Sequence, residues 1–387
     1  MAEYETIRLE DYRPSEPGAR GSFDVPFAML TLLLLSIGVV MVLSASFARA
    51  YYDFENRTGG RATYYFLRQL VFAVLGVVAM FAASRFHVNT YRKYSVALMG
   101  IALGLLFAVL FIGSKINNAR RWINLGFTTF QPSEIAKIAM ILYFATLICK
   151  YKERMATPRG LIPFVAILAS IIFLLVLEPH FSASVIMFLI AAIMLFLGGA
   201  QLRWFIVGGG AFALVGLLIV TKFSYASSRI SAWLNPYDYA TGDGWQIIQS
   251  LYAVGSGGLL GTGLGQSRQK YLYLPEEHND FIFSVVCEEL GFIGAVLILL
   301  LFALLVCRGY WLAIHAKDRY SFLVCMGITS LLAIQVILNV AVVTNFMPAT
   351  GISLPFFSYG GTALLIQLAE MGIILSISRD IPSKKSG

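Results

Sequence analysis

The sequence predicts an all-α polytopic membrane protein with about ten transmembrane helices and a large extracytoplasmic loop between the seventh and eighth. First, 58% of the 387 residues are hydrophobic and only 13% are charged, roughly half the charged fraction of an average soluble domain. Second, mean hydropathy is +0.76, and apolar segments of about 20 residues, long enough to cross a bilayer, recur along the chain. Third, Lys and Arg gather in alternate loops.

The ten predicted spans follow the apolar runs and form one transmembrane domain over residues 26–378. A polar tail, residues 1–25, precedes them and a short tail, residues 379–387, follows. The first tail contains acidic residues, which the charged region of a secretory signal peptide lacks, so we expect it to remain as a cytoplasmic tail. The predicted spans are 26–46, 66–84, 95–113, 134–149, 161–177, 183–199, 203–221, 281–306, 321–344 and 356–378.

The loop charges predict that both ends of the chain are cytoplasmic, because basic residues concentrate in the loops on that side. These residues are Arg85, Arg92, Lys93, Lys150, Lys152, Arg154, Arg159, Arg203, Arg308, Lys317, Arg319, Arg379, Lys384 and Lys385. The net charge of +8 is scattered among these loops, so the membrane explains it better than nucleic acid does.

One predicted outer loop breaks this pattern. Its sequence, "GSKINNARRWINLG", carries Lys115, Arg120 and Arg121. Basic residues placed against the orientation bias indicate an anionic ligand outside the membrane. Contact with lipid headgroups, or a salt bridge, is the alternative explanation.

The longest polar segment, about residues 222–280, is predicted to lie outside the membrane. Within it, "WQIIQSLYAV" predicts a short interfacial amphipathic helix, with Trp245 and Tyr252 suited to the headgroup zone. The stretch "GSGGLLGTGLGQS" follows. A dinucleotide-binding loop would need a strand before it and a helix after it, so we expect a flexible or re-entrant turn at the membrane surface. The four cysteines lack metal-site spacing and are expected to be small buried hydrophobes without disulfides.

Five carboxylates cluster in the stretch "LPEEHNDFIFSVVCEELG". An ionised carboxylate in hydrocarbon is costly, so this cluster calls for a functional explanation. Asp280 is placed at the start of the eighth span, and His278 either handles protons there or is a hydrogen-bonded structural residue. Glu276 and Glu277 are expected to be solvated loop acids.

Two of the five acids, Glu288 and Glu289, lie two turns deeper. Adjacent positions on a helix are about 100° apart, so at most one of them faces a given groove squarely. We expect the other to hydrogen-bond a neighbouring helix.

Two further outer segments carry polar groups. In "FQPSEIAKIAM", Glu134 and Lys137 stand three residues apart and can pair on one helix face. A Lys one turn inside a span faces protein or an aqueous cavity, and a purely structural ion pair is the alternative. In "TNFMPATGISLPFFSYGGTALL", Pro and Gly predict a hairpin that dips toward the membrane, where Ser358 could line a site. The sequence contains no nucleophile elbow and no zinc-ligand set.

Together these motifs resemble the SEDS family of polytopic membrane proteins, which includes FtsW, RodA and SpoVE. The resemblance covers nearly the whole chain. It depends on "VVMVLSAS", "NNARRWINLG", "FQPSEIAKIAM", "GSGGLLGTGLGQSRQKYLYLPEEHNDFIFSVVCEELG" and "TGISLPFFSYGG". The first and last of these are more similar to the FtsW and SpoVE branch than to RodA.

The resemblance implies a peptidoglycan glycosyltransferase that polymerises lipid II on the outer face of the bacterial cytoplasmic membrane. The family's catalytic aspartate corresponds to Asp280. Asn279, Cys287 and Thr362 stand where the family usually has Thr, Gly and Ser, and none of these departures is expected to abolish activity. The residues expected to bind substrate are Lys115, Arg120, Arg121, Glu134, Lys137, Lys270, His278 and Ser358, with Glu288 and Glu289 as structural support.

Glycosyl transfer from a lipid diphosphate needs a base for the acceptor hydroxyl and positive charge for the leaving group. Asp280 and the basic residues meet these needs, with inversion at the donor carbon. No cofactor is required by any motif, and a divalent cation, Mg²⁺ or Mn²⁺, at the diphosphate is left open. The resemblance implies a class B penicillin-binding protein as partner, with other divisome or elongasome membrane proteins. A lipid II flippase and a noncatalytic scaffold for that partner remain alternatives.

Overall fold

The computed structural model describes residues 21–53, 58–116, 119–126, 128–222, 224–242 and 244–381. Within them, ten helices are long and apolar enough to cross a membrane, as predicted. These are α1 (Val25–Tyr52), α2 (Tyr64–Ala83), α3 (Val88–Ile112), α4 (Pro132–Lys150), α5 (Pro158–Leu177), α6 (Phe181–Gly198), α7 (Leu202–Lys222), α10 (Ile282–Ile314), α11 (Arg319–Val343) and α12 (Gly361–Ser378).

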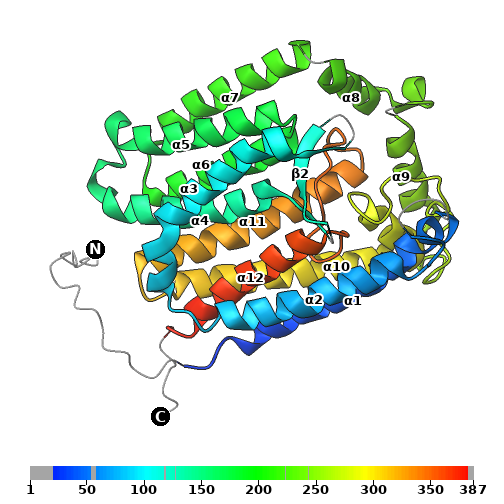
Figure 1. The fold of residues 1–387 in the computed structure, drawn as a ribbon, viewed down its shortest axis with the longest axis horizontal. Coiled ribbons are helices and arrows are strands. Elements are labelled where there is room, and N and C mark those ends of the chain that lie inside the picture. The colour runs from blue at the N-terminus through cyan, green and yellow to red at the C-terminus, as the bar shows by residue number, and fades with distance from the viewer. Residues whose placement is uncertain are drawn as a thin grey trace.

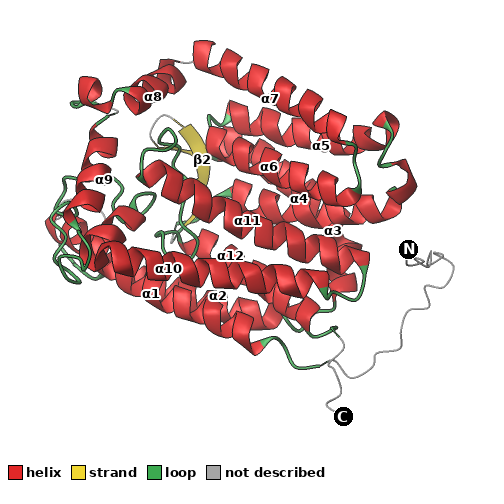
Figure 2. Cartoon of the chain, turned by 180° about the vertical axis from the view of Figure 1, so that it is seen from behind, coloured by secondary structure: helices red, strands yellow, loops and turns green. Residues whose placement is uncertain are grey.

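The spanning helices run roughly along one direction, and most of the connecting structure gathers at one end of the bundle (Figures 1 and 2). That end holds α8 (Ser224–Leu234), the short helix η3 (Pro236–Tyr239) and α9 (Trp245–Ser256). The short helix predicted over "WQIIQSLYAV" is confirmed as α9, and its place at the membrane surface stays a prediction, whereas α8 was not predicted. A second short helix, η2 (Lys152–Arg154), follows α4.

The predicted basic loop contains three strands that were not predicted from the sequence. They are β1 (Ser114–Ile116), β2 (Ala119–Asn124) and β3 (Thr129–Phe130), which form a small antiparallel sheet in the order β1-β2-β3. Strand β2 pairs Ile123 with Phe130, which carries the chain directly into the start of α4. The sheet therefore fixes the basic residues of β2 relative to that helix.

The core lies between the helices, with α12 packed against α2, α10 against α11, and α1 against both α10 and α2. In the 18-residue windows of highest hydropathy, 78% of α4 and 72% of α11 is buried, but none of α7. Helix α7 therefore lies at the edge of the bundle, where Phe212 stacks on Phe188 of α6 with ring centroids 4.2 Å apart.

Four span boundaries differ from the prediction by five or more residues: α1 ends at Tyr52 instead of 46, α3 starts at Val88 instead of 95, and two others differ for clear reasons. Helix α10 continues to Ile314, eight residues beyond the predicted end at 306, because its last two turns are still held against the bundle. Helix α12 starts at Gly361 instead of 356. The residues before it, including Phe356 and Phe357, are apolar and fully buried but belong to the irregular hairpin, so hydropathy alone could not separate them from a span.

Three segments meet at the end of the bundle opposite the loops. The carboxylate of Asp24 caps α1 by accepting from the Phe27 N–H at 2.9 Å and pairs with both arms of Arg308 at 3.1 and 2.5 Å. The Asp24 N–H donates to Ser378 Oγ at 3.0 Å. The start of α1 and the end of α12 therefore lie at the same end of the bundle.

Helix α10 is broken at Gly291, where φ is 67° and ψ is −172°. The glycine-rich stretch predicted as a flexible or re-entrant turn supplies backbone partners there. Four hydrogen bonds join the two segments: Thr262 N–H to Glu288 O at 2.9 Å, Gly263 N–H to Glu289 O at 3.1 Å, Phe292 N–H to Gly258 O at 2.9 Å, and Ile293 N–H to Leu259 O at 3.1 Å. A Cβ on Gly291 would lie 2.2 Å from the Gly261 nitrogen, so the contact requires glycine.

The cysteines are free, as predicted. Cys287 and Cys325 are buried and Cys149 is half-buried, but Cys307 is exposed on α10. The expectation that all four are buried was wrong for Cys307, because apolar residues of a spanning helix can face lipid as readily as protein.

Candidate functional site

Asp280 lies in the loop between α9 and α10, two residues before α10 begins. Asn339 of α11 fixes this loop by donating from Nδ2 to the Asp280 carbonyl at 2.8 Å and to the Ile352 carbonyl at 2.7 Å. The side chain points toward Gly351, where an added Cβ would lie 3.1 Å from Asp280 Oδ2. Within the described part of the chain, the Asp280 carboxylate forms no hydrogen bond, so it is available to a substrate.

The pKa of the Asp280 carboxyl is raised to about 6. Burial is the main cause, and the nearby Glu276 carboxylate adds to it, while Arg229, His278 and Arg121 act in the opposite direction. A carboxyl with this pKa is mostly ionised at pH 7 yet binds a proton more readily than an ordinary aspartate. Those are the properties of a general base.

The hairpin before α12 holds the Asp280 loop through backbone contacts. Ser358 Oγ donates to the Asn279 carbonyl at 2.8 Å and accepts from the Leu354 N–H at 2.7 Å. The Tyr359 N–H donates to the His278 carbonyl at 2.8 Å. The geometry therefore gives Ser358 a positioning role, because its hydroxyl is occupied by the two loops that it joins.

Glu277 is not the solvated loop acid that the sequence suggested. Its side chain is fully buried and accepts from Arg49 of α1 at 2.7 and 2.8 Å. Burial alone would raise the pKa of Glu277, but the nearby His278 ring and the hydrogen-bonded Arg49 guanidinium lower it overall. Glu276 is half-buried and accepts from Asn279 Nδ2 at 2.5 Å, so the expectation of solvated loop acids was wrong for Glu277 and holds only in part for Glu276.

His278 is buried in an aromatic cluster beside this ion pair. Its ring centroid lies 4.6 Å from that of Tyr65 and 5.7 Å from that of Tyr359, and Nδ1 lies 3.7 Å from Glu277 Oε1. These contacts favour the structural alternative for His278. Its charge still acts on Asp280 when the ring is protonated.

The structure separates two of the three basic residues of the outer loop, Arg120 and Arg121. Arg121 of β2 turns toward the α5–α6 connection, where it donates to the carbonyls of Glu178 (3.3 Å) and Pro179, and its charge also reaches Asp280. Arg120 is exposed and donates to the Leu110 carbonyl at 3.1 Å. Lys115 lies in β1 opposite Arg120, but its side chain is outside the described part of the structure.

Glu134 and Lys137 form the predicted ion pair, with Oε2 and Nζ 2.8 Å apart. Both side chains are nearly buried at the outer-loop end of α4. The charge of Lys137 acts on His180, the residue that precedes α6. The pairing is confirmed, and the role of either residue in substrate binding stays a prediction.

Glu288 and Glu289 hold the outer loop to the membrane helices, as expected of structural residues. Glu289 is fully buried, pairs with Lys270 Nζ at 2.7 Å and accepts from Ser44 of α1 at 2.7 Å. The Lys270 ammonium also donates to Ser44 Oγ at 3.0 Å. Lys270 is thus committed to a buried network, and the geometry does not support its predicted role as a substrate ligand.

Glu288 binds backbone N–H groups of the same loop. Its carboxylate accepts from the N–H groups of Arg268 and Gln269 at 2.8 and 3.3 Å and from the hydroxyl of Ser267. The network lies at a defined depth: Ser44 is 20 positions along α1 from Asp24, roughly 30 Å at about 1.5 Å per residue, close to the thickness of a bilayer's hydrocarbon core. The network therefore lies near the end of α1 that is opposite Asp24.

Sequence reasoning missed Arg229 of α8. Its guanidinium donates to the Ala349 carbonyl at 2.6 Å and lowers the pKa of Asp280. The sequence marks this residue only as a single Arg in the amphipathic stretch "SSRISAWL". Its position near Asp280 follows only from the way α8 folds back over the hairpin.

A second missed group lies at the α5–α6 connection. Burial raises the pKa of Glu178 to about 8, although Arg121 opposes the rise. Burial, with help from Arg121 and Lys137, lowers the pKa of His180 to about 3. Both side chains are therefore neutral near pH 7. Their only signal was the acid and imidazole of "LEPHF" at the end of an apolar run.

Metal binding by protein side chains alone finds no support in the described residues. Nowhere among them do three His, Cys, Asp or Glu side chains come together as metal ligands. Mg²⁺ commonly takes one or two carboxylates together with phosphate oxygens of a substrate, so a divalent ion here would depend on a bound diphosphate.

Comparisons with known proteins agree with this architecture. A family model covering FtsW, RodA and SpoVE, described as "Cell cycle protein", matches residues 25–382. The chain is 44% identical over 361 residues to stage V sporulation protein E of Bacillus subtilis, covering 92% of this chain and 97% of that protein. It is 41% identical over 367 residues to a probable peptidoglycan glycosyltransferase FtsW of Trichlorobacter lovleyi, covering 94% and 95%.

Solved structures show the same fold. One, described as structural coordination of polymerization and crosslinking by a peptidoglycan synthase complex, matches with a TM-score of 0.75 and 29% identity, over 92% of this chain and 98% of that one. The rod shape determining protein RodA of Thermus thermophilus matches with a TM-score of 0.68 and 27% identity, over 94% and 98%. The chain belongs to the FtsW, RodA and SpoVE family of multi-pass membrane proteins.

Proposed function

We propose that this protein is a peptidoglycan glycosyltransferase that polymerises lipid II at the outer face of the bacterial cytoplasmic membrane. The observation that carries the proposal is Asp280: a carboxylate with a pKa near 6, without a hydrogen-bond partner among the described residues and within the field of two arginines. The name of the relative at 41% identity, a probable peptidoglycan glycosyltransferase, supports the same reaction class.

In the proposed reaction, Asp280 accepts the proton of the acceptor sugar's C4 hydroxyl as that oxygen attacks the donor's anomeric carbon. The bond from that carbon to the diphosphate oxygen breaks, and the lipid diphosphate leaves with the bonding electrons. A single displacement inverts the donor carbon. Arg121, whose charge acts on Asp280, and Lys137, which shares the neighbour His180 with Arg121, are the cations that we propose stabilise the developing negative charge.

The test is polymerisation of lipid II by the purified full chain. Loss of a positioned general base costs about 10²–10⁴-fold, so Asp280→Asn should make no detectable polymer while retaining the wild-type melting temperature. Asp238→Asn is the matched control, because Asp238 is an exposed acid in η3 of the same outer loop. Robust glycan synthesis by folded Asp280→Asn protein would remove Asp280 from the mechanism.

The same assay separates the two other functions. A lipid II flippase would move labelled lipid between leaflets of a vesicle without forming polymer. A noncatalytic scaffold would do neither, and wild-type protein would then remain inactive with its transpeptidase present. We propose a class B penicillin-binding protein as that partner, supported by the likeness to a peptidoglycan synthase complex.

The proposed orientation puts both termini in the cytoplasm. It is supported by the charge of the loops and by the contacts that join the start of α1 to the end of α12. In a cysteine-free background, a cysteine at Gly242 should react with an impermeant thiol reagent added to intact cells, whereas one at Ser386 should not. Labelling of Ser386 would reverse the orientation.

A further inference from the structure

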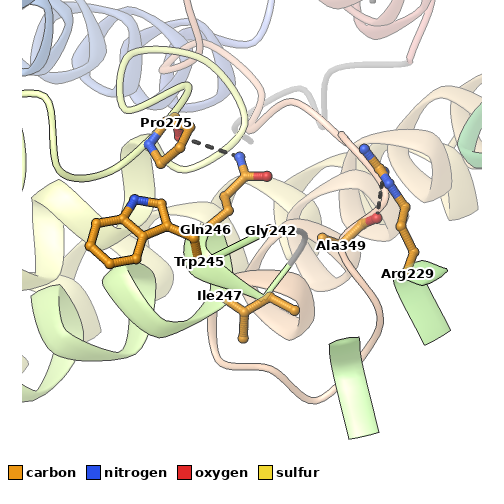
Figure 3. Close-up of a pocket in the computed structure, with 7 residues that line it drawn as sticks. All are labelled: Arg229, Gly242, Trp245, Gln246, Ile247, Pro275 and Ala349. Carbon is orange, nitrogen blue, oxygen red and sulfur yellow. Dashed lines mark hydrogen bonds between the residues drawn. The ribbon is translucent and has the colours of Figure 1, made fainter. Parts of the chain in front are cut away.

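A pocket of about 140 Å³ opens beside the Asp280 loop. Figure 3 shows Trp245 and Gln246 of α9 on one side and Arg229 with Ala349 on the other, with Pro275 next to the indole. These residues come from α8, α9, the Asp280 loop and the hairpin before α12. The pocket therefore lies where the outer segments converge, away from the hydrocarbon region.

The pocket borders the proposed reaction centre through two of its walls. Arg229 is near enough to lower the pKa of the Asp280 carboxyl. Ala349, whose carbonyl accepts from Arg229 at 2.6 Å, is two residues from Gly351, the glycine that faces Asp280 Oδ2. A group bound in the pocket would thus be next to a group that reacts at Asp280.

The lining combines one oriented aromatic ring with planar polar groups. The indole of Trp245 is 37% exposed, and its Nε1 donates to the Tyr273 carbonyl at 2.8 Å, which fixes the ring. Gln246 Nε2 donates to the Pro275 carbonyl at 3.3 Å, an arrangement that leaves the amide oxygen as an acceptor for a hydroxyl. The guanidinium of Arg229 supplies donors opposite.

This chemistry suits a sugar ring. A pyranose has an apolar face that packs on an aromatic ring and edge hydroxyls that bind amides and guanidinium groups. Pockets that enclose a whole drug-sized ligand occupy about 300–1,000 Å³, so this smaller, open pocket fits a single ring or side group.

We propose that this pocket is the subsite for the acceptor sugar, and the proposal rests on the proposed function. The cations suited to the donor's diphosphate, Arg121 and Lys137, both act on His180 at the α5–α6 connection, and Arg121 also acts on Asp280. The pocket is lined by different segments: α8, α9, the Asp280 loop and the hairpin before α12. Because the general base must touch the acceptor hydroxyl, the ring that carries this hydroxyl is the one placed against Trp245.

The experiment uses purified full chain, lipid II as donor and a water-soluble disaccharide peptide that lacks the lipid diphosphate and can only accept. The half-saturating concentration of this acceptor is measured at fixed lipid II. Trp245→Ala should raise it about five- to ten-fold, the loss expected for one well-placed aromatic contact. Gln246→Ala should raise it in the same direction, and the half-saturating concentration of lipid II as donor should not change.

Two variants separate binding from structural effects. Trp245→Phe keeps a ring but loses the hydrogen bond to Tyr273, so it should behave nearly as wild type. Trp311→Ala removes a comparably exposed tryptophan, 42% exposed, at the opposite membrane side and should have no effect.

Wild-type acceptor saturation in Trp245→Ala, or a Trp245→Phe defect as large as that of Trp245→Ala, would overturn the subsite. Failure of the proposed function looks different: the wild type itself would then join no sugars, or the Asp280→Asn protein would remain active.

Discussion

The buried network around Lys270 gives a prediction that separates structure from catalysis. Lys270 is 2% exposed and Glu289 is fully buried, with Nζ and Oε1 2.7 Å apart. The substitution Lys270→Met keeps most of the side chain's length but leaves the Glu289 carboxylate with only Ser44 and one backbone N–H as partners. An uncompensated buried charge is then the main effect of the change.

Removing one partner of a buried ion pair typically costs about 3–5 kcal/mol. At about 2.1 cal/mol/K per residue, the 387 residues give an unfolding entropy of roughly 0.8 kcal/mol/K, so the melting temperature should fall by about 4–6 °C. The second variant, Lys270→Met with Glu289→Gln, removes the stranded charge. It should recover several degrees, because replacing both charges is much cheaper than breaking the pair.

The assay is thermal unfolding of each purified variant in the same detergent, followed by lipid II polymerisation at a temperature where all remain folded. Lys270→Met should keep measurable activity there. If it instead melts within about 2 °C of wild type and loses substrate affinity, or if the double variant is no more stable than the single one, Lys270 is a substrate ligand and its structural assignment fails.

Two further predictions concern the Asp280 environment. Because the base must be deprotonated, kcat/KM should rise with pH through about 6 and level off above it. Arg121→Met removes a cation that lowers the pKa of Asp280, so the rise in kcat/KM should move to higher pH. Arg120→Met is the control, and its pH profile should match that of the wild type. Gly351→Ala puts a Cβ 3.1 Å from Asp280 Oδ2 at a φ of +71° and should slow turnover roughly 10- to 100-fold through misplacement of the base. Gly126→Ala, at a φ of +86° with open space around it, carries the same backbone strain, and a rate equal to that of Gly351→Ala would refute the crowding argument.

The membrane helices could be predicted from the sequence because hydrocarbon imposes length and polarity on each span. The predicted start of the last span was wrong because the apolar residues before it are surrounded by protein and not by lipid. Phe356 and Phe357 are as buried as any span residue, but they lie in an irregular hairpin whose backbone groups find partners such as Gln367 and Ser358. Hydropathy cannot distinguish these two environments.

Side-chain contacts in the site could be predicted where the two residues are close together in the sequence. Glu134 and Lys137 pair because three residues of helix bring them to one face. Glu277 and Arg49 could not be matched, because they are 228 positions apart and only the packing of the Asp280 loop against α1 joins them. Arg229 was missed for the same reason: its partner, Ala349, contributes only a backbone carbonyl, which no sequence pattern marks.

The break at Gly291 divides α10 into two mechanical parts. The outer part, residues 282–290, is tied to the glycine-rich stretch through the Glu288 and Glu289 carbonyls and to Lys270 through the Glu289 carboxylate. The inner part is a membrane span whose tilt responds to bilayer thickness, and its first residues, Phe292 and Ile293, donate to the same glycine-rich stretch. A change of tilt therefore pulls on this stretch, so the outer loop that carries Asp280 should respond to the chain length of the surrounding lipid.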